Sequence, residues 1–274
     1  MPEKSDNPVL RFENVSVSFD DNPALIDVSF ETLEGESRVI LGAAGSGKTV
    51  VLKTAMGLVK PHEGRIFVFG QDITEMEERD LFGIRVKIGM LFQESALFDS
   101  LTIEENVAYP LLNQKSLQVT RDDALPRVKE ALEFVELGQT LDKFPNELSG
   151  GMRRRAAIAR AVVTEPPLQM YDSPTAGLDP ITAHTIMALL IKERDVSQAT
   201  TLMVTHRYQD GNLMANFRYN SEQGALEPAR NGTRTAGRTI FMVMKEGRLI
   251  FEGDQDELEA SGDPYISKFC KHGT

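Results

Sequence analysis

Three features of the sequence predict an α/β fold. Strand-like segments rich in β-branched and aromatic residues fill the first 94 residues, helical patterns dominate residues 95–166, and strands and helices alternate again from residue 167. No internal repeat and no Ser/Gly/Pro-rich linker divides the chain. We therefore expect one α/β domain over residues 9–253, with its core in 9–94 and 167–253, a helical subdomain at 95–166 and a C-terminal tail at 254–274.

The composition is that of an ordinary globular protein, and it excludes several classes. With 274 residues, 41% of them hydrophobic and 26% charged, the chain can bury a core without disulfides or structural metals. Its net charge of −11 argues against nucleic-acid binding, which needs a basic surface. No apolar run approaches the ~18–20 residues that cross a bilayer, the N-terminus lacks the pattern of a signal peptide, and a single cysteine, Cys270, fits a reducing compartment.

The first elements are short strands separated by turn residues. Asp, Asn, Pro and Gly divide segments in which β-branched and aromatic residues prevail, while Gly57 and Pro61 mark the end of the first helix. The pattern predicts strands at 9–12, 24–30, 37–41, 65–69 and 86–92, and a helix at 49–58.

Residues 95–166 predict three helices. Thr102 and Glu105 have the spacing of a capping box at the start of the first helix, and apolar residues recur at three- and four-residue intervals through the second. The expected helices are 102–109, 122–135 and 149–163, and they are followed by a strand at 168–171, a helix at 181–194 and a strand at 200–204.

The segment from His206 to Ile240 is polar and less regular. Apolar and aromatic residues on either side of Gly224 predict a loose hairpin of 217–219 with 225–227, and we expect 228–238 to form a mobile loop. The pattern of this segment indicates no chemistry.

One motif indicates phosphate binding. The run Gly42-Ala43-Ala44-Gly45-Ser46-Gly47-Lys48-Thr49 satisfies G-x-x-x-x-G-K-[ST] and lies between a predicted strand and a predicted helix. Glycines let backbone N–H groups turn toward an anion, and the helix N-terminus adds positive potential. Lys48 can reach the β- and γ-phosphates of a nucleotide, and the Thr49 hydroxyl can ligate Mg²⁺. The alternative is a glycine-rich turn that happens to carry Lys-Thr.

Two further motifs indicate a nucleotide site less specifically when each is considered alone. Leu148-Ser149-Gly150-Gly151-Met152 precedes a helix, so Ser149 can cap it and the glycines expose N–H groups to an anion, although a capped helix alone would look the same. The arginines at 153–155 are expected on a solvated helix face. The predicted strand at 168–172 ends in Asp172, a position from which a carboxylate can hold Mg²⁺, and it contains Gln169, whose buried amide would need partners.

Taken together, these motifs resemble those of the ATP-binding-cassette (ABC) ATPases over roughly residues 9–253. Six elements occur in the order of that family: the phosphate loop 42–49, Gln93, 148–152, Asp172, the run 176–179 and Val204-Thr205-His206. The resemblance implies a P-loop NTPase (RecA-like) core with an antiparallel β subdomain and an inserted α-helical subdomain. It also implies two copies of the chain packed head to tail, with each ATP between the phosphate loop of one copy and the Ser-Gly-Gly turn of the other.

The resemblance also implies roles for single residues. Phe19 would stack on adenine, Asp172 would hold Mg²⁺, and Gln93 would contact Mg²⁺ or the attacking water. Asp179 would cross the interface between the two copies, and His206 would contact the γ-phosphate.

A narrower resemblance concerns the ATPases of Mla/Mce-type bacterial lipid transporters. The segments 90–100, 105–111 and 149–156 are similar to theirs, and residues 96–98 fall near the surface that receives a permease helix in the family. The resemblance implies a peripheral ATP-driven subunit on the cytoplasmic face of the inner membrane, working with permease subunits and a Mce-type lipid-binding protein. The alternatives are an ABC ATPase of another solute importer or exporter, a soluble ABC protein of translation or DNA repair, and a nucleotide-dependent dimerising switch.

The chain departs from the family pattern after Asp172. The family has Glu there, which polarises the attacking water, whereas this chain has Ser173. A hydroxyl group is a poor general base, and loss of such a base typically costs about 10²–10⁴ in rate. The sequence therefore predicts impaired hydrolysis, either because the substitution was engineered to trap the ATP-bound dimer or because the natural enzyme is slow.

Overall fold

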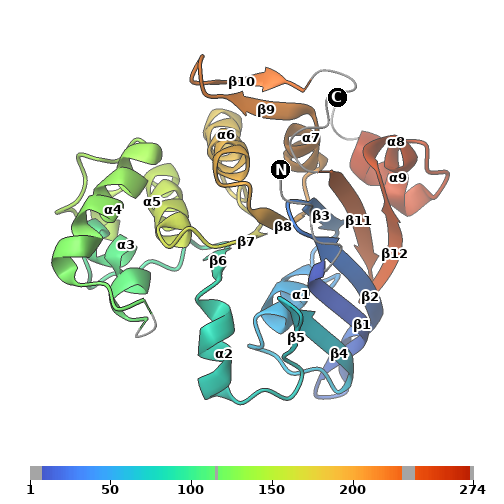
Figure 1. The fold of residues 1–274 in the computed structure, drawn as a ribbon. Coiled ribbons are helices and arrows are strands. Elements are labelled where there is room, and N and C mark those ends of the chain that lie inside the picture. Colours follow the sequence, from blue (N-terminus) through green and yellow to red (C-terminus); the bar gives the residue numbers. More distant parts are fainter. Residues whose placement is uncertain (1–7, 115–116, 230–237, 272–274) are drawn as a thin grey trace, which may run out of the picture.

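The computed structural model describes residues 8–114, 117–229 and 238–271, and its elements are drawn in Figure 1. Its largest sheet contains four strands that the sequence predicts, β3, β6, β7 and β8, each one to three residues longer or shorter than expected. Its strands are β3 (Ser37–Gly42), β6 (Ile88–Leu91), β7 (Leu168–Asp172), β8 (Thr200–Thr205), β11 (Thr239–Lys245) and β12 (Arg248–Gly253).

The large sheet is parallel except at one edge. Its strand order is β12-β11-β3-β8-β7-β6, and only β12 runs antiparallel to its neighbour. The register pairs Leu41 with Thr205, Asp172 with Val204, and Leu91 with Tyr171. The carboxyl ends of β3, β8, β7 and β6 therefore meet at one edge of the sheet, which is where ligands bind in open α/β folds.

A second sheet is antiparallel, as the family resemblance implies. It consists of β1 (Pro8–Phe19), β2 (Asn22–Leu33), β4 (Glu63–Val68) and β5 (Gln71–Asp72) in the order β2-β1-β4-β5. A separate hairpin pairs β9 (Phe217–Asn220) with β10 (Ala225–Pro228), which confirms the hairpin predicted around Gly224. Residues 230–237, most of the loop expected at 228–238, lie outside the described residues.

The helical subdomain lies to one side of the sheets in Figure 1, coloured green to yellow. Thr102 begins its first helix with the predicted capping box, in which the Glu105 N–H donates to Thr102 Oγ1 and the Thr102 N–H donates to Glu105 Oε2. A 3₁₀ turn, Pro145–Glu147, precedes its last helix. The subdomain consists of α3 (Ile103–Leu112), α4 (Arg121–Phe134) and α5 (Gly150–Val162).

The remaining helices surround the large sheet. Those at α1 and α6 match the predicted helices, whereas α2, α7, α8, α9 and the strands β11 and β12 are not predicted by the sequence pattern. None of the helices among the described residues is long and apolar enough to cross a membrane. Their bounds are α1 (Lys48–Ala55), α2 (Glu78–Arg85), α6 (Pro180–Ser197), α7 (Tyr208–Asn216), α8 (Gln255–Glu259) and α9 (Pro264–Lys271).

The large sheet separates two apolar clusters. Val39 and Leu41 point into a cluster shared with the helical subdomain and α6. Ile40, between them, points into a cluster shared with α1 and the antiparallel sheet. The same alternation holds along β7, where Tyr171 faces the first cluster and Met170 the second. Side chains alternate between the two faces of a strand, so both faces of this sheet are covered.

Candidate functional site

The fold brings four sequence-predicted groups to one sheet edge. The phosphate loop follows β3, His206 follows β8, Asp172 ends β7, and Gln93 lies two residues beyond β6. Because these strands are neighbours in the sheet, the four groups line up along its carboxyl edge. The structure therefore places together residues that are up to 164 positions apart in the sequence.

The phosphate loop has the backbone that its glycines allow. Gly45 and Gly47 adopt φ values of +76° and +100°, a region that side chains other than glycine rarely occupy. A Cβ atom at Gly47 would also lie 2.5 Å from the Ala24 carbonyl oxygen. Gly47 caps α1, so the positive end of that helix points at the loop.

Lys48 is folded into the loop. Its Nζ donates to the carbonyl oxygens of Gly42 at 2.8 Å and Ala43 at 2.7 Å, and to Ser46 Oγ at 3.3 Å. Burial lowers the pKa of the Lys48 ammonium, while the negative charge of Asp172 raises it. The loop therefore holds a cation within electrostatic reach of the Asp172 carboxylate.

Asp172 and Ser173 are tied to each other. Asp172 is only 4% exposed, and Ser173 Oγ donates to Asp172 Oδ1 at 3.0 Å. The Ser173 N–H donates to the Val204 carbonyl oxygen at 2.8 Å, and Ser173 has a φ of +48° in the left-handed region. The hydroxyl group thus serves as a hydrogen-bond donor to the neighbouring carboxylate, which is not the arrangement of a general base.

The donor set at this edge fits Mg²⁺. Asp172 supplies a carboxylate, Thr49 a hydroxyl and Gln93 an amide oxygen, which are the hard oxygen ligands that Mg²⁺ prefers. Within the described residues there is no group of three or more His, Cys, Asp or Glu side chains that could hold a metal.

The Ser-Gly-Gly turn begins α5 as predicted. Ser149 caps the helix, and its Oγ accepts the Met152 N–H at 3.3 Å. A Cβ atom at Gly151 would lie 2.7 Å from Thr182 Cγ2, so α5 and α6 approach closely at this point.

Asp179 caps the neighbouring helix α6. Its Oδ1 accepts the N–H groups of Ile181 at 3.1 Å and Thr182 at 3.0 Å. Hydrogen bonding to Thr182 lowers the pKa of Asp179 and keeps it ionised. The N-termini of α5 and α6 therefore lie next to each other, and Ser149 and Asp179 are both exposed.

Two arginines of α5 have a role that the sequence does not predict. The expectation of a solvated arginine face is wrong for Arg154, which is 5% exposed and donates through Nη1 to the Phe92 carbonyl oxygen at 2.8 Å. Arg160 donates to the carbonyl oxygens of Ala96 at 2.7 Å and Ser95 at 2.9 Å. These bonds fasten the segment on both sides of Gln93 to α5.

Phe19 and His206 are exposed. Phe19 ends β1 in a tight connection to β2, where it pairs with Asn22, and its side chain is 48% exposed. His206 follows β8 directly. Both side chains are open to a ligand arriving from solvent.

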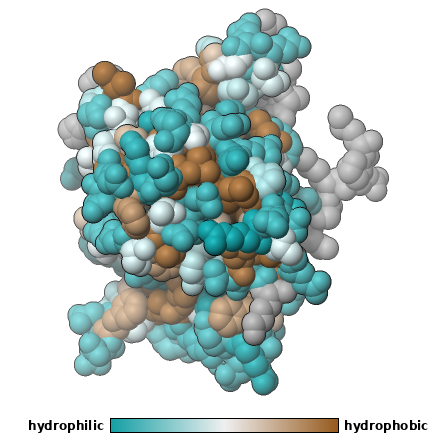
Figure 2. Space-filling view, turned by 90° about the vertical axis from the view of Figure 1, so that its left-hand side faces the viewer, coloured by the Kyte–Doolittle hydropathy of each residue, from teal (hydrophilic) through white to brown (hydrophobic). Residues whose placement is uncertain are grey.

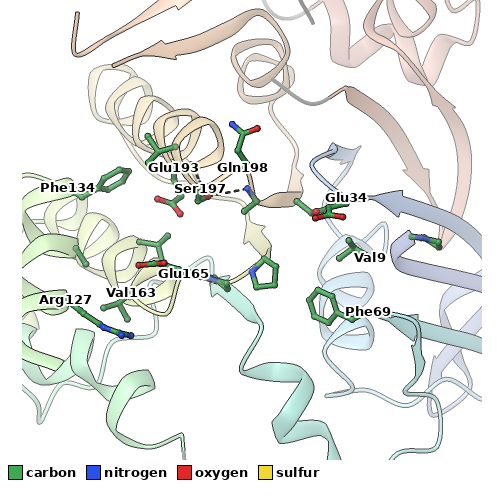
Figure 3. Close-up of a pocket in the computed structure, with 18 of the residues that line it drawn as sticks. Val9, Glu34, Phe69, Arg127, Phe134, Val163, Glu165, Glu193, Ser197 and Gln198 are labelled. Carbon is green, nitrogen blue, oxygen red and sulfur yellow. Dashed lines mark hydrogen bonds between the residues drawn. The ribbon is translucent and has the colours of Figure 1, made fainter. Parts of the chain in front are cut away.

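A large cavity among the described residues lies elsewhere. It measures about 1190 Å³ and is lined by residues at the amino ends of β7 and β8, opposite the phosphate loop. Figure 3 shows Phe134, Glu165 and Glu193 on one side of it and Val9 and Phe69 on the other.

Glu193, which lines this cavity, is a hydrogen-bond partner of the buried Gln169 amide. Gln169 Nε2 donates to Glu193 Oε1 at 2.7 Å, and the Tyr171 hydroxyl donates to Gln169 Oε1. Burial raises the pKa of Glu193. The buried amide of Gln169 therefore has hydrogen-bond partners for both its nitrogen and its oxygen.

Comparisons with known proteins agree with this geometry. The profile of the ABC transporter family matches residues 25–176, more than half of the chain. A probable ribonucleotide transport ATP-binding protein, mkl, of Mycobacterium leprae is 38% identical over 260 residues, which are 95% of this chain and 68% of that protein. The intermembrane phospholipid transport system ATP-binding protein MlaF of Haemophilus influenzae is 30% identical over 263 residues, or 96% and 90% of the two chains.

Another relative is named for a different transport function. The methionine import ATP-binding protein MetN of Bifidobacterium longum is 36% identical over 272 residues, 96% of this chain and 61% of that protein. The chain thus spans about two thirds of the length of mkl and MetN but most of MlaF.

Solved structures share the fold over nearly the whole chain. The ATP-binding cassette MJ0796, in a dimeric post-hydrolysis state bound to ADP and Pi, has a TM-score of 0.74 and 29% identity over 89% of this chain and 98% of its own. CbiO1 of Clostridium perfringens, part of the ABC transporter complex cbiONQ, has a TM-score of 0.75 and 27% identity over 98% and 96%. The chain has the P-loop NTPase core, antiparallel sheet and helical subdomain of these cassettes, and it belongs to the ABC transporter family as an ATP-binding ATPase subunit.

Proposed function

We propose that this chain drives a bacterial lipid transporter of the Mla/Mce type from the cytoplasmic face of the inner membrane. The observation that favours lipid transport is the similarity to MlaF, which extends over 90% of that protein's length. MlaF is the phospholipid transport ATPase among the relatives named above. The partners of this proposal are permease subunits and a Mce-type lipid-binding protein.

Nucleotide binding in this proposal rests on the loop at β3. The glycine-rich backbone of 42–49 and the Lys48 ammonium bind the β- and γ-phosphates of ATP. Thr49, Asp172 and Gln93 would hold Mg²⁺, which when bound neutralises developing charge on the phosphates. Phe19 stacks on the adenine ring.

The second half of each nucleotide site comes from another copy of the chain. Ser149, Gly150 and Gly151 present N–H groups and the positive end of α5 to the γ-phosphate held by the partner. Leu148 and Met152 flank this turn, and Asp179 beside it organises the opposite site across the interface. His206 contacts the γ-phosphate from the same copy as the phosphate loop.

The membrane partner is proposed to contact the helical subdomain. Phe98 and Tyr109 are 42% and 41% exposed, and their ring centroids lie 4.7 Å apart. The Arg160 guanidinium lies 5.9 Å from the Phe98 ring centroid and also donates to the segment after Gln93. Figure 2 views the molecule from the side of this subdomain and shows small hydrophobic areas among hydrophilic residues. A permease helix seated on Phe98 and Tyr109 would therefore touch a surface connected to Gln93.

Two other functions have specific observations in their favour. The similarity to MetN favours an importer of another small solute. Ser173, whose hydroxyl donates to Asp172, favours a switch that dimerises on ATP with little turnover. A soluble ABC protein without a membrane partner is the remaining alternative.

Purification with native membrane partners tests the transport proposal. A tagged chain solubilised from its own membranes in mild detergent should carry a permease and a single-span lipid-binding protein, identified by mass spectrometry. A permease accompanied by a soluble solute-binding protein would replace lipid transport by solute import. Recovery of the chain without any membrane protein would contradict the transporter assignment of this proposal.

Nucleotide binding is tested separately by Lys48→Ala. Loss of a charge-assisted contact of this kind should weaken Mg-ATP binding about 10- to 100-fold in calorimetric titration. Lys53→Ala is the matched control, because Lys53 is exposed in the last turn of the same helix. Equal affinities for Lys48→Ala and Lys53→Ala would show that the loop is not the site.

A further inference from the structure

The C-terminal helix α9 reaches the phosphate loop through one side chain. The Tyr265 hydroxyl oxygen accepts the Ala43 N–H at 3.1 Å and donates its proton to the Met244 carbonyl oxygen, also at 3.1 Å. Ala43 is the second residue of the phosphate loop, and Met244 of β11 pairs in register with Gly42. The hydroxyl group therefore bridges the loop and the neighbouring strand.

The same peptide group of the loop is held from its other side by Lys48. The Ala43 N–H and the Gly42 carbonyl belong to one planar unit, because the peptide bond joins these residues. Its oxygen accepts from Lys48 Nζ at 2.8 Å, and its N–H donates to Tyr265. This peptide carries one of the three oxygen atoms that hold the Lys48 ammonium, and the bond to Tyr265 opposes rotation of its plane.

The tyrosine is itself firmly placed. The Tyr265 N–H donates to Asp263 Oδ1 at 2.7 Å, and its ring packs edge to face with Phe269 at a centroid distance of 5.3 Å. The Lys245 ammonium lies 5.3 Å from the centroid of the Tyr265 ring. The next residue, Ile266, is buried in the apolar cluster that includes Phe241 of β11. The hydroxyl position is thus set by the packing of α9.

Gly42 lies close against β11. A Cβ atom at Gly42 would lie 2.6 Å from the Met244 carbonyl oxygen and 2.5 Å from Ser46 Oγ. Gly42 therefore has no room for a side chain, and the loop is packed against β11 next to the peptide that Tyr265 holds.

We propose that Tyr265 is a positioning residue for nucleotide binding, which fixes the Gly42–Ala43 peptide so that Lys48 is oriented toward the β- and γ-phosphates. This inference rests on the proposed nucleotide site. It makes the affinity for ATP depend on a residue of α9 that lies 222 positions from Ala43 in the sequence.

The experiment compares Tyr265→Phe with Tyr219→Phe in the full chain. Tyr265→Phe removes the bridging oxygen and keeps the ring against Phe269, whereas Tyr219 lies in β9, away from the phosphate loop. Calorimetry with Mg-ATP should give a dissociation constant about 3- to 10-fold higher for Tyr265→Phe, the effect of one neutral hydrogen bond, and an unchanged constant for Tyr219→Phe. Hydrogen exchange at the Ala43 amide should accelerate only in Tyr265→Phe.

The outcomes separate this inference from the nucleotide site itself. Affinity of Tyr265→Phe within twofold of the parent, or tighter, would overturn the positioning role. So would an equal weakening in Tyr219→Phe. A normal affinity of Lys48→Ala would instead overturn the site, and that measurement does not involve Tyr265. Steady-state kinetics adds a readout, because a positioning residue should raise KM for ATP more than it lowers kcat.

Discussion

At residue 173 the chain carries a hydroxyl group where catalysis would need a base. Ser173 Oγ donates to Asp172 Oδ1, so its own proton is directed toward the proposed metal ligand and away from any water. Both residues are buried at the end of β7. Binding of ATP requires neither group to act as a base, but activation of the attacking water does.

We therefore predict that Ser173→Glu raises the single-turnover rate of ATP hydrolysis by about 10²-fold or more, since a carboxylate can polarise the water. It should also shorten the lifetime of the ATP-bound dimer. Rapid-quench assays with radiolabelled ATP measure the rate. The control is Ser173→Ala, which should stay within about threefold of the parent. Fast turnover of the parent chain would mean that another residue acts as the base.

Glu193 is the residue for which pH dependence can be predicted. Burial raises the pKa of its carboxyl group, so the folded chain binds this proton more readily than the unfolded chain. The free energy of unfolding attributable to Glu193 therefore falls as pH rises from the unfolded pKa through the raised folded pKa.

Glu193→Gln should remove this pH-dependent fall in the free energy of unfolding, because the amide does not ionise. The amide oxygen can still accept the hydrogen bond from Gln169 Nε2. We predict a higher Tm for the variant at pH 8 and a smaller advantage at pH 4. The difference should be a few degrees, because roughly 1 kcal/mol shifts the Tm of a domain of this size by about 2–4 °C. Thermal melts between pH 4 and pH 8 provide the measurement. A Tm of Glu193→Gln below that of the parent at pH 8 would contradict a raised pKa for Glu193.

At the scale of elements, α5 is fastened to the segment after β6 through Arg154. Arg154→Ala should reduce the free energy of unfolding by about 1.5–3 kcal/mol, the usual contribution of a hydrogen bond from a charged group. The Phe92 carbonyl oxygen would lose its partner as well. Urea denaturation measures the change, with Arg127→Ala as the control because Arg127 is exposed on α4. A loss below about 0.5 kcal/mol, typical of surface positions, would mean that the bond contributes little.

The elements that the sequence predicts are those with strong local signals. The phosphate loop, the Ser149 cap and the strand ending in Asp172 are predicted because each depends on residues close in sequence. Helix α2 is missed because only Leu81 and Ile84 of its eight residues are buried, too few to show a helical period.

The missed site residues depend on tertiary contacts. Arg154 lies 62 positions from the carbonyl group that it binds, and Tyr265 lies 222 from its partner. The sequence predicts that an arginine in a run of three is exposed, because buried cations are rare in proteins. The protein compensates by giving its guanidinium a carbonyl partner, which only the folded structure reveals.

At the scale of the whole molecule, the proposed site is incomplete in one copy. Ser149→Arg would place a long cationic side chain where the turn meets the partner's nucleotide. We predict that it abolishes ATP-dependent dimerisation, as measured by light scattering of the parent chain and the variant in the presence of ATP. Folding should survive, because Ser149 is exposed and its removal costs only the cap, typically about 1 kcal/mol.

Ser149→Ala separates the two effects of that substitution. It removes the same cap without adding bulk, so it should retain dimerisation with a modest loss of stability. Dimers of Ser149→Arg in ATP at the level of the parent would contradict the head-to-tail arrangement. Loss of dimers in both variants would instead assign the effect to the cap.

The two apolar clusters on the faces of the large sheet have a genetic consequence. Ile40 and Leu41 are joined by one peptide bond, yet Ile40 belongs to the cluster with α1 and the antiparallel sheet, and Leu41 belongs to the cluster on the other face, where α7 packs on β3. A cavity made by Leu41→Ala can be refilled only from its own side of the sheet. We expect suppressor mutations of Leu41→Ala to map to residues of the first cluster and those of Ile40→Ala to residues of the second, so that adjacent codons have their second-site suppressors on opposite faces of the sheet.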